Sequence, residues 1–121
     1  MGNRSFFVMA LLALPVLAQA GDHRVEIGTG MASYYGSELS GNRTASGERF
    51  DPNAMTAAHR TLSFGSLVAV TNLANGQEVV VRVNDRGPWG KSRIMDVSYA
   101  AAKQLGMHRS GTAKVKLELL D

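Results

Sequence analysis

The dipeptide Asn75-Gly76 is the feature of this sequence that most constrains its fold. Both residue types accept a positive φ, which the tightest hairpin turns require. Valines alternate with other residues at positions 68 and 70 before the turn and at positions 79, 81 and 83 after it. Alternation with a period of two is typical of strands that bury one face. The pattern predicts a β-hairpin over residues 67–83.

Other segments also predict strands and short helices, and together with the hairpin they indicate a small barrel. Residues 31–35 and 93–97 are strand candidates, and residues 113–119 alternate apolar and charged side chains. Asp51-Pro52 predicts the start of a short helix over residues 53–59. Ser98 and Gly106 are typical of the two ends of a second short helix over residues 99–105. Many short strands with two short helices predict a mainly β barrel.

A weak internal repeat supports the same architecture. Asp51, a short helix, Gly65-Ser66 and an alternating strand occur in that order. Asp96, a short helix, Gly111-Thr112 and another alternating strand follow in the same order. Two similar halves would suit a barrel with pseudo-two-fold symmetry. Chance similarity of such short units is the alternative.

The first twenty residues are typical of a secretory signal peptide. Arg4 precedes an apolar stretch over residues 6–17, and Ala18-Gln19-Ala20 provides the small residues of a cleavage site. A membrane anchor is the alternative, but a span needs about 20 apolar residues. We expect cleavage after residue 20, no stable membrane insertion afterwards, and a periplasmic or secreted protein. Residues 21–29 are expected to form a flexible lead, and residues 30–120 a single domain.

Composition excludes several classes of function. The chain has no cysteine, so it cannot use a disulfide scaffold, a thiol nucleophile or a lipid attached to cysteine. The formal net charge of +3 is small and unclustered, so it predicts no nucleic-acid binding. His23, His59 and His108 lie far apart in the sequence and give no metal-ligand spacing. We therefore expect no metal and no cofactor.

Carboxylates are the remaining candidates for chemistry. Asp85 lies in a dense turn signal after the valine strand, where it could serve the turn or act as a catalytic acid. Glu48 ends the polar loop of residues 37–49 and could be a solvated charge. Asp96 could stabilise a helix N-terminus or pair with an arginine at position 86 or 93. His59 could equally be a partly buried structural histidine.

Long motifs are spread over residues 30–120, in a fixed order. They are GMASYYG at residues 30–36, TASGERFD at 44–51, TAAHRTL at 56–62, VTNL at 70–73 with NG at 75–76, VRVNDRGP at 81–88, and RIMDVSYAAA at 93–102 with LG at 105–106. Together they resemble the RlpA-like (rare lipoprotein A) family. The resemblance implies a six-stranded double-psi β-barrel with short helices.

The same resemblance implies a function. Members of the family are lytic transglycosylases that cleave peptidoglycan glycan strands, often strands stripped of stem peptides, and leave 1,6-anhydro-N-acetylmuramic acid ends in cell-wall remodelling. The wider barrel group includes expansin-like modules, so a non-catalytic peptidoglycan- or polysaccharide-binding module is the alternative. A barrel that docks on or inhibits another protein is a third hypothesis.

The resemblance also assigns roles to residues. Asp85 matches the catalytic acid, and Glu48 and His59 match the other polar residues of the groove. Tyr34, Tyr35, Thr44, Arg86 and Trp89 are expected to contact the glycan. The acid must carry a proton near neutral pH, which burial or the charge of Glu48 would favour. The sequence shows neither of two features of the family, a lipobox cysteine and a C-terminal peptidoglycan-binding repeat domain, so lipid anchoring is not expected and the choice between septal and general location stays open.

Overall fold

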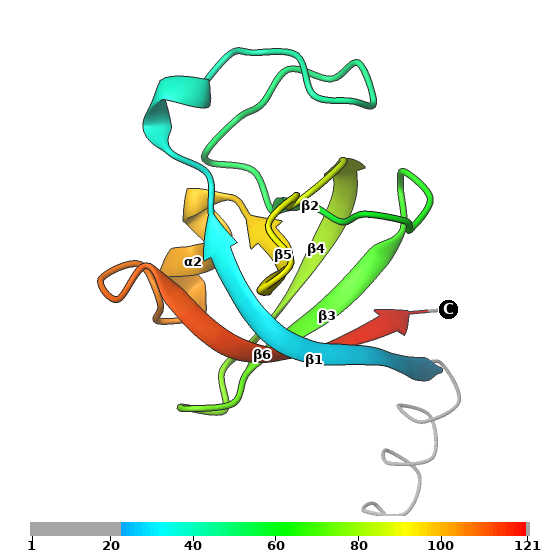
Figure 1. Cartoon of the computed structure of the whole chain (residues 1–121), viewed down its shortest axis with the longest axis vertical. Helices are drawn as coiled ribbons and strands as arrows, with labels where there is room; N and C mark the ends of the chain where they lie inside the picture. Colours follow the sequence, from blue (N-terminus) through cyan, green and yellow to red (C-terminus); the bar gives the residue numbers. More distant parts are fainter. Residues whose placement is uncertain (1–22, 121) are drawn as a thin grey trace, which may run out of the picture.

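The structure, a computed structural model, describes residues 23–120, and within them six strands close into a barrel (Figure 1). The strand order around the barrel is β1-β5-β2-β4-β3-β6. The elements are β1 (Arg24–Tyr34), η2 (Ser37–Leu39), β2 (Thr56–Ala58), β3 (Leu67–Asn72), β4 (Glu78–Asp85), β5 (Arg93–Val97), α2 (Tyr99–Gln104) and β6 (Thr112–Leu120). The predicted mainly β, six-stranded barrel is thus confirmed. The signal peptide predicted over residues 1–20 lies outside the described residues.

The barrel is built from two equivalent halves. The strand order is unchanged when β1, β2 and β3 are exchanged with β4, β5 and β6. The directions obey the same exchange, since β1 runs parallel to β5 as β2 does to β4, and β1 runs antiparallel to β6 as β3 does to β4. The two-half arrangement expected from the sequence repeat is therefore present in the strand topology.

Alternating valines form the centre of the core, as the sequence predicts. The fully buried side chains include those of Val68, Val70, Val81, Val83, Met95, Val97, Leu105, Met107, Val115 and Leu117. Each such side chain contributes about 1.5–3 kcal/mol by leaving water. The hairpin between β3 and β4 turns at Gly76, whose φ is 77°.

Helix α2 covers the core from one side and has the predicted ends. The hydroxyl of Ser98 accepts a hydrogen bond of 3.2 Å from the backbone N–H of Ala101. Gly106 follows the helix with a φ of 71°, in the left-handed region that favours glycine. None of the helices in residues 23–120 has the length and apolar character that crossing a bilayer requires.

The helix expected over residues 53–59 is absent, and that expectation was wrong. Asp51 instead forms a turn, with its carboxylate accepting from the N–H of Asn53 at 2.9 Å and its carbonyl from that of Ala54 at 3.1 Å. The next residues form β2, which is buried at all three positions between β4 and β5. Pairing with two neighbouring strands therefore overrides the local helix signal.

Residues 24–29, expected as part of a flexible lead, belong to β1. They pair with β6 from Arg24, opposite Leu120, to Thr29, opposite Lys116. Val25 and Ile27 alternate with Arg24 and Glu26, but all four side chains are exposed, so this alternation does not bury a face against the core. Backbone hydrogen bonding to β6 rather than side-chain burial holds this part of the strand.

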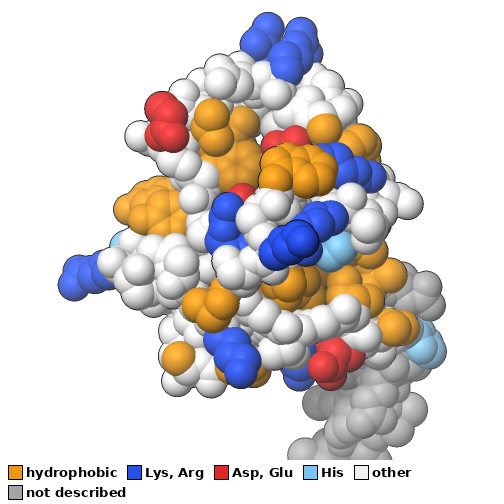
Figure 2. All heavy atoms as spheres, in the orientation of Figure 1, with side chains coloured by type: hydrophobic (Ala, Val, Ile, Leu, Met, Phe, Trp, Pro, Cys, Tyr) orange, Lys and Arg blue, Asp and Glu red, His pale blue; other side chains and the backbone are white. Residues whose placement is uncertain are grey.

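Strand ends and a long loop define one end of the barrel. The last residues of β1, β2 and β4 come together there, since Ala58 pairs with both Asp85 and Asp96, and Ser33 also pairs with Asp96. The loop over residues 36–55 rises above this end, as Figure 1 shows. Figure 2 shows apolar side chains gathered beneath that loop, with acidic and basic side chains beside them.

Candidate active site

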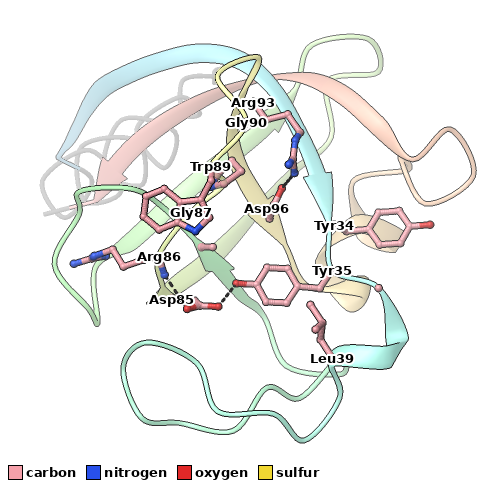
Figure 3. A pocket seen from close by; sticks show the side chains of 13 residues that line it. Tyr34, Tyr35, Leu39, Asp85, Arg86, Gly87, Trp89, Gly90, Arg93 and Asp96 are labelled. Atoms are coloured by element: carbon pink, nitrogen blue, oxygen red, sulfur yellow. Dashed lines mark hydrogen bonds and ion pairs between the residues drawn. The ribbon is translucent and has the colours of Figure 1, made fainter.

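A cavity of about 370 Å³ opens at this end of the barrel. It is lined by residues from β1, β2, β4, β5 and the connection of residues 86–92 between β4 and β5. The lining includes Tyr34, Tyr35, Leu39, Ala58, Asp85, Arg86, Trp89, Arg93 and Asp96, many of which are drawn in Figure 3. Four of the residues predicted from sequence to bind substrate, and the predicted acid, are thus brought together.

Asp85, the last residue of β4, is held at this cavity by three hydrogen-bond donors. Its Oδ2 accepts from the hydroxyl of Tyr35 at 2.6 Å. Its Oδ1 accepts from the backbone N–H of Ala45 at 2.8 Å and from that of Arg86 at 2.9 Å. The carboxylate is therefore fixed in orientation by the residue that follows β1, by the long loop and by its own turn.

Tyr35 is the side-chain donor to Asp85, and Figure 3 shows its hydroxyl directed at the carboxylate. Burial, followed by the hydrogen bond to Asp85 and its negative charge, raises the pKa of Tyr35 far above the ordinary value. The phenol therefore keeps its proton and acts as a donor. Its ring packs on Phe50 with the ring centroids 4.6 Å apart.

Glu48 lies outside the cavity lining and is bound to β4. Its two oxygens accept from the guanidinium of Arg82 at 2.6 and 3.0 Å, and one accepts from the amide of Asn84 at 3.2 Å. The hydrogen bonds from Arg82 and Asn84 lower the pKa of Glu48 below its ordinary value, so it stays ionised. Glu48 therefore secures the long loop to β4 in this structure.

His59 follows β2 and touches Asp85 through the backbone, with its N–H donating to the Asp85 carbonyl at 3.1 Å. Its Nδ1 accepts from the N–H groups of Thr61 and Leu62, both at 3.2 Å. Burial and then the charges of two nearby arginines lower the pKa of His59, so the ring is neutral near pH 7. The imidazole thus shapes the turn after β2.

Thr44 lines a smaller cavity of about 120 Å³ that also contains Asp85 and Tyr35. Its hydroxyl donates to the carbonyl of Glu48 at 2.9 Å. The side chain is buried, so its hydroxyl serves the loop rather than the open cavity.

Tyr34 contributes a ring to the cavity wall. Its hydroxyl donates to the carbonyl of His108 at 2.7 Å, and its ring lies 5.6 Å from that of Tyr99. Both contacts fix the ring in place, so Tyr34 presents its ring face, and not its hydroxyl, to the cavity.

Two arginines fasten the turn of residues 59–66 to the connection of residues 86–92. Arg86 donates to the carbonyls of His59 at 3.2 Å and Leu62 at 2.8 Å, and it lies over the Phe64 ring at 4.1 Å. Arg60 points the opposite way and donates to the carbonyls of Pro88 at 2.8 Å, Gly90 at 2.7 Å and Arg93. Each of the two segments therefore carries an arginine that donates to backbone carbonyls of the other.

Trp89 lies between Pro88 and Gly90, whose carbonyls Arg60 binds. It is the most exposed large hydrophobic side chain in the described residues, at 76%. Figure 3 places it at the cavity, on the connection that Arg60 holds. An exposed aromatic face held on an anchored loop can pack against the C–H face of a sugar ring.

The sequence reasoning gave Asp96 only structural roles and did not consider Arg60, and both become functional candidates in the structure. The predicted pairing of Asp96 with an arginine is confirmed, since Arg93 donates to its Oδ1 at 2.5 Å. The helix-capping role falls to Ser98 instead. Asp96 also lines the cavity, and Ala58 separates it from Asp85 across β2. Only strand register could have revealed that proximity.

Known proteins resemble this chain in sequence over the barrel. A family model described as "Lytic transglycolase" matches residues 27–117. A protein of Synechocystis sp. named "Probable endolytic peptidoglycan transglycosylase RlpA" is 57% identical over 91 residues, which are 75% of this chain and 28% of that protein. A protein of Neisseria meningitidis named "Endolytic peptidoglycan transglycosylase RlpA" is 58% identical over 90 residues, 74% of this chain and 38% of that protein. The chain therefore spans less than half the length of these relatives.

Solved structures resemble the fold at low sequence identity. A Streptomyces papain inhibitor superposes with a TM-score of 0.63 at 20% identity, covering 82% of this chain and 96% of the inhibitor. The apo expansin of Clavibacter michiganensis gives a TM-score of 0.61 at 19% identity, covering 77% of this chain and 50% of the expansin. At such identities the likeness concerns the barrel alone.

Proposed function

The chain belongs to the RlpA-like family of lytic transglycosylases, and from this premise we propose that it is an endolytic peptidoglycan transglycosylase. It would cleave the bond between N-acetylmuramic acid and N-acetylglucosamine within glycan strands and leave 1,6-anhydro ends. Such an enzyme acts outside the cytoplasm, where peptidoglycan lies, and remodels the wall there. The observation that carries the proposal is the fixed carboxylate of Asp85 beside an exposed aromatic face in one cavity.

Asp85 performs both proton transfers in this proposal. Its carboxylic acid protonates the glycosidic oxygen as the bond from that oxygen to C1 of the muramic acid breaks. The C6 hydroxyl of the same sugar attacks C1, and its proton returns to the Asp85 carboxylate. The nucleophile is intramolecular, and such arrangements reach effective molarities of about 10⁵–10⁸ M. One carboxylate therefore suffices where most hydrolases use two.

The two oxygens of Asp85 have different hydrogen-bond partners and therefore different roles. Oδ1 accepts two backbone N–H groups, whereas Oδ2 accepts only the Tyr35 hydroxyl among the described residues. Oδ2 thus has room for the transferred proton. The three donors stabilise the carboxylate once its proton has moved to the leaving group.

Glu48 and His59 support this chemistry as positioning residues. Glu48 fastens to β4 the loop that carries the N–H of Ala45. His59 holds the turn onto which Arg86 donates. Both act through the backbone that surrounds Asp85.

Tyr34 and Trp89 supply the apolar faces for sugar rings, and glycan strands freed of stem peptides are the proposed substrate. A strand without peptides can lie along a surface lined by rings, because its sugar faces are unobstructed. The signal peptide over residues 1–20 would direct the protein to the compartment that contains this substrate.

The test compares the purified protein with Asp85→Asn on intact peptidoglycan and on amidase-treated strands. Mass spectrometry should find 1,6-anhydro-N-acetylmuramic acid ends with the wild type only, and more of them from the amidase-treated strands. Sedimentation with the same polymers measures binding separately. Binding without cleavage by the wild type would favour a non-catalytic wall-binding module of the expansin type.

A further inference from the structure

We propose that Arg93 and Asp96 form a recognition site for the acetamido group of an amino sugar, beside the acid Asp85. The inference rests on the proposed function, because it concerns how that cavity selects its glycan. Both residues belong to β5 and line the same cavity as Asp85, as Figure 3 shows.

A three-residue network fixes the Asp96 carboxylate from one side. Its Oδ1 accepts from the Ser33 hydroxyl at 2.5 Å and from Nη1 of Arg93 at 2.5 Å. Nη1 of Arg93 also donates to the Ser33 oxygen at 2.6 Å. Within residues 23–120, Oδ2 of Asp96 and the remaining guanidinium N–H groups of Arg93 have no hydrogen-bond partner. The pair therefore retains one fixed acceptor close to fixed donors.

This pairing of an acceptor with a donor matches an acetamido group. The group has an N–H that needs an acceptor and a carbonyl that needs a donor. Oδ2 of Asp96 would accept the N–H, and Arg93 would donate to the carbonyl. Both bonds involve an ionised protein group, which strengthens them. A hydroxyl at the same carbon of the sugar has its donor and its acceptor on a single oxygen, whereas the acetamido group has them on two separate atoms.

The strand register places this site next to the acid. Ala58 of β2 pairs with Asp85 on one side and with Asp96 on the other, so two strand spacings, about 10 Å, separate their Cα atoms. Tyr35, which donates to Asp85, lines the same cavity as both carboxylates. The Arg93–Asp96 pair would therefore lie next to an amino sugar that is bound at Asp85.

Stability alone gives little reason for this network. The backbone of β1 and β5 is already paired from Met31 to Tyr34. The side chains of Arg93 and Asp96 remain 34% and 19% exposed, and partly exposed ion pairs add little to folding. A purely structural clamp between β1 and β5 is the competing explanation, and the test below separates the two.

Chitohexaose and cellohexaose provide the test, because they share chain length and linkage and differ at C2 of each ring. Isothermal titration calorimetry should show that the wild type binds chitohexaose about tenfold more tightly than cellohexaose. Asp96→Asn keeps an oxygen for Ser33 and Arg93 but turns the acceptor facing the ligand into a donor. We expect it to reduce the preference to less than about twofold, while cellohexaose binds as before.

Control variants keep the outcome interpretable. Glu118→Gln removes a carboxylate that pairs with Arg24 and Lys116 on the side of the barrel, so it should keep the full preference. Ser33→Ala keeps both charges but loosens the carboxylate, so it should lose part of the preference even where Asp96→Asn fails to fold. An unchanged preference in folded Asp96→Asn, or no preference in the wild type, would overturn the inference. Binding is measured without cleavage, so failure of the proposed enzymatic activity would be seen separately.

Discussion

The hydroxyl of Tyr35 donates a 2.6 Å hydrogen bond to Oδ2 of Asp85 and so joins the end of β1 to the end of β4. These two strands are equivalent in the pseudo-two-fold barrel. The bond therefore crosses between the halves of the fold at the cavity. Asp85 owes its orientation to a partner fifty residues away, so its role depends on the closed barrel.

Tyr35→Phe should lower kcat with little effect on KM. The substitution keeps the ring that packs on Phe50 but removes the donor that stabilises the Asp85 carboxylate. Loss of one such donor typically lowers kcat by about 10²-fold or more. Steady-state kinetics on amidase-treated strands would measure the change. Tyr34→Phe, which removes a hydroxyl that donates to the His108 carbonyl and not to Asp85, is the matched control and should retain most of kcat. Equal losses in both variants would contradict the assigned role of Tyr35.

His59 should make the protein less stable as the pH falls. Its pKa in the folded chain lies below the ordinary value of 6.5, because burial and then Arg60 and Arg86 disfavour its charged form. The unfolded chain therefore binds more protons near and below pH 6.5, and stability rises with pH through that range. Thermal unfolding at pH 5 and pH 7.5 would measure the difference.

His59→Asn provides the comparison for this pH effect. Asparagine offers an acceptor for the N–H groups of Thr61 and Leu62 without titrating. The variant should lose less stability than the wild type between pH 7.5 and pH 5, and it should keep kcat within a few-fold. A loss of kcat as large as that of Asp85→Asn would instead make the imidazole a proton-transfer group.

Arg60→Ala should destabilise the protein and weaken substrate binding together. The variant leaves the carbonyls of Pro88, Gly90 and Arg93 without their charged donor, which should cost about 2 kcal/mol. The loop carrying Trp89 is no longer held, so KM should rise. Urea unfolding and steady-state kinetics measure the two effects. Arg109→Ala, which removes an exposed arginine, should change stability by less than about 0.5 kcal/mol.

Trp89→Ala should weaken glycan binding with little loss of stability. The side chain is 76% exposed, so the folded chain gains little from it. Loss of a stacking face should raise the Kd for denuded strands by about tenfold. Sedimentation with denuded strands and thermal unfolding would report the two quantities. Unchanged binding would place the glycan elsewhere on the barrel.

Local sequence pattern predicts the segments of this fold that bury one face. The valines around Gly76 and the residues of β6 alternate because one side of each strand faces the core. β2 and the start of β1 escaped prediction for opposite reasons. β2 is short and buried at every position, so it shows no period of two. Residues 24–27 do alternate, but the alternation is only four residues long and its apolar side chains are exposed, so it falls short of the pattern of a strand that buries one face.

The repeat also shows the limit of sequence symmetry. The strand order is shared by the two halves, but only the second half has a helix after its middle strand. In the first half that position is taken by the turn of residues 59–66, which His59 and Arg86 hold. Functional loops thus diverge while the paired strands are retained.

The candidate site was predictable only where a motif carries it. Asp85, Tyr35 and Trp89 lie in or beside motifs and meet at the cavity. Asp96 comes close to Asp85 because Ala58 pairs with both β4 and β5. Arg60 contributes to the site because it donates to carbonyls about thirty residues away in the chain. Such relationships arise from register and loop crossing, which no local pattern encodes.

The most direct test of the central claim is cleavage of denuded glycan strands in water enriched in ¹⁸O. If Asp85 directs the C6 hydroxyl of the substrate to C1, mass spectrometry will find 1,6-anhydro ends that contain no ¹⁸O. Asp85→Asn should give neither anhydro ends nor any other new ends. Reducing N-acetylmuramic acid ends that carry one ¹⁸O would show hydrolysis and contradict the account.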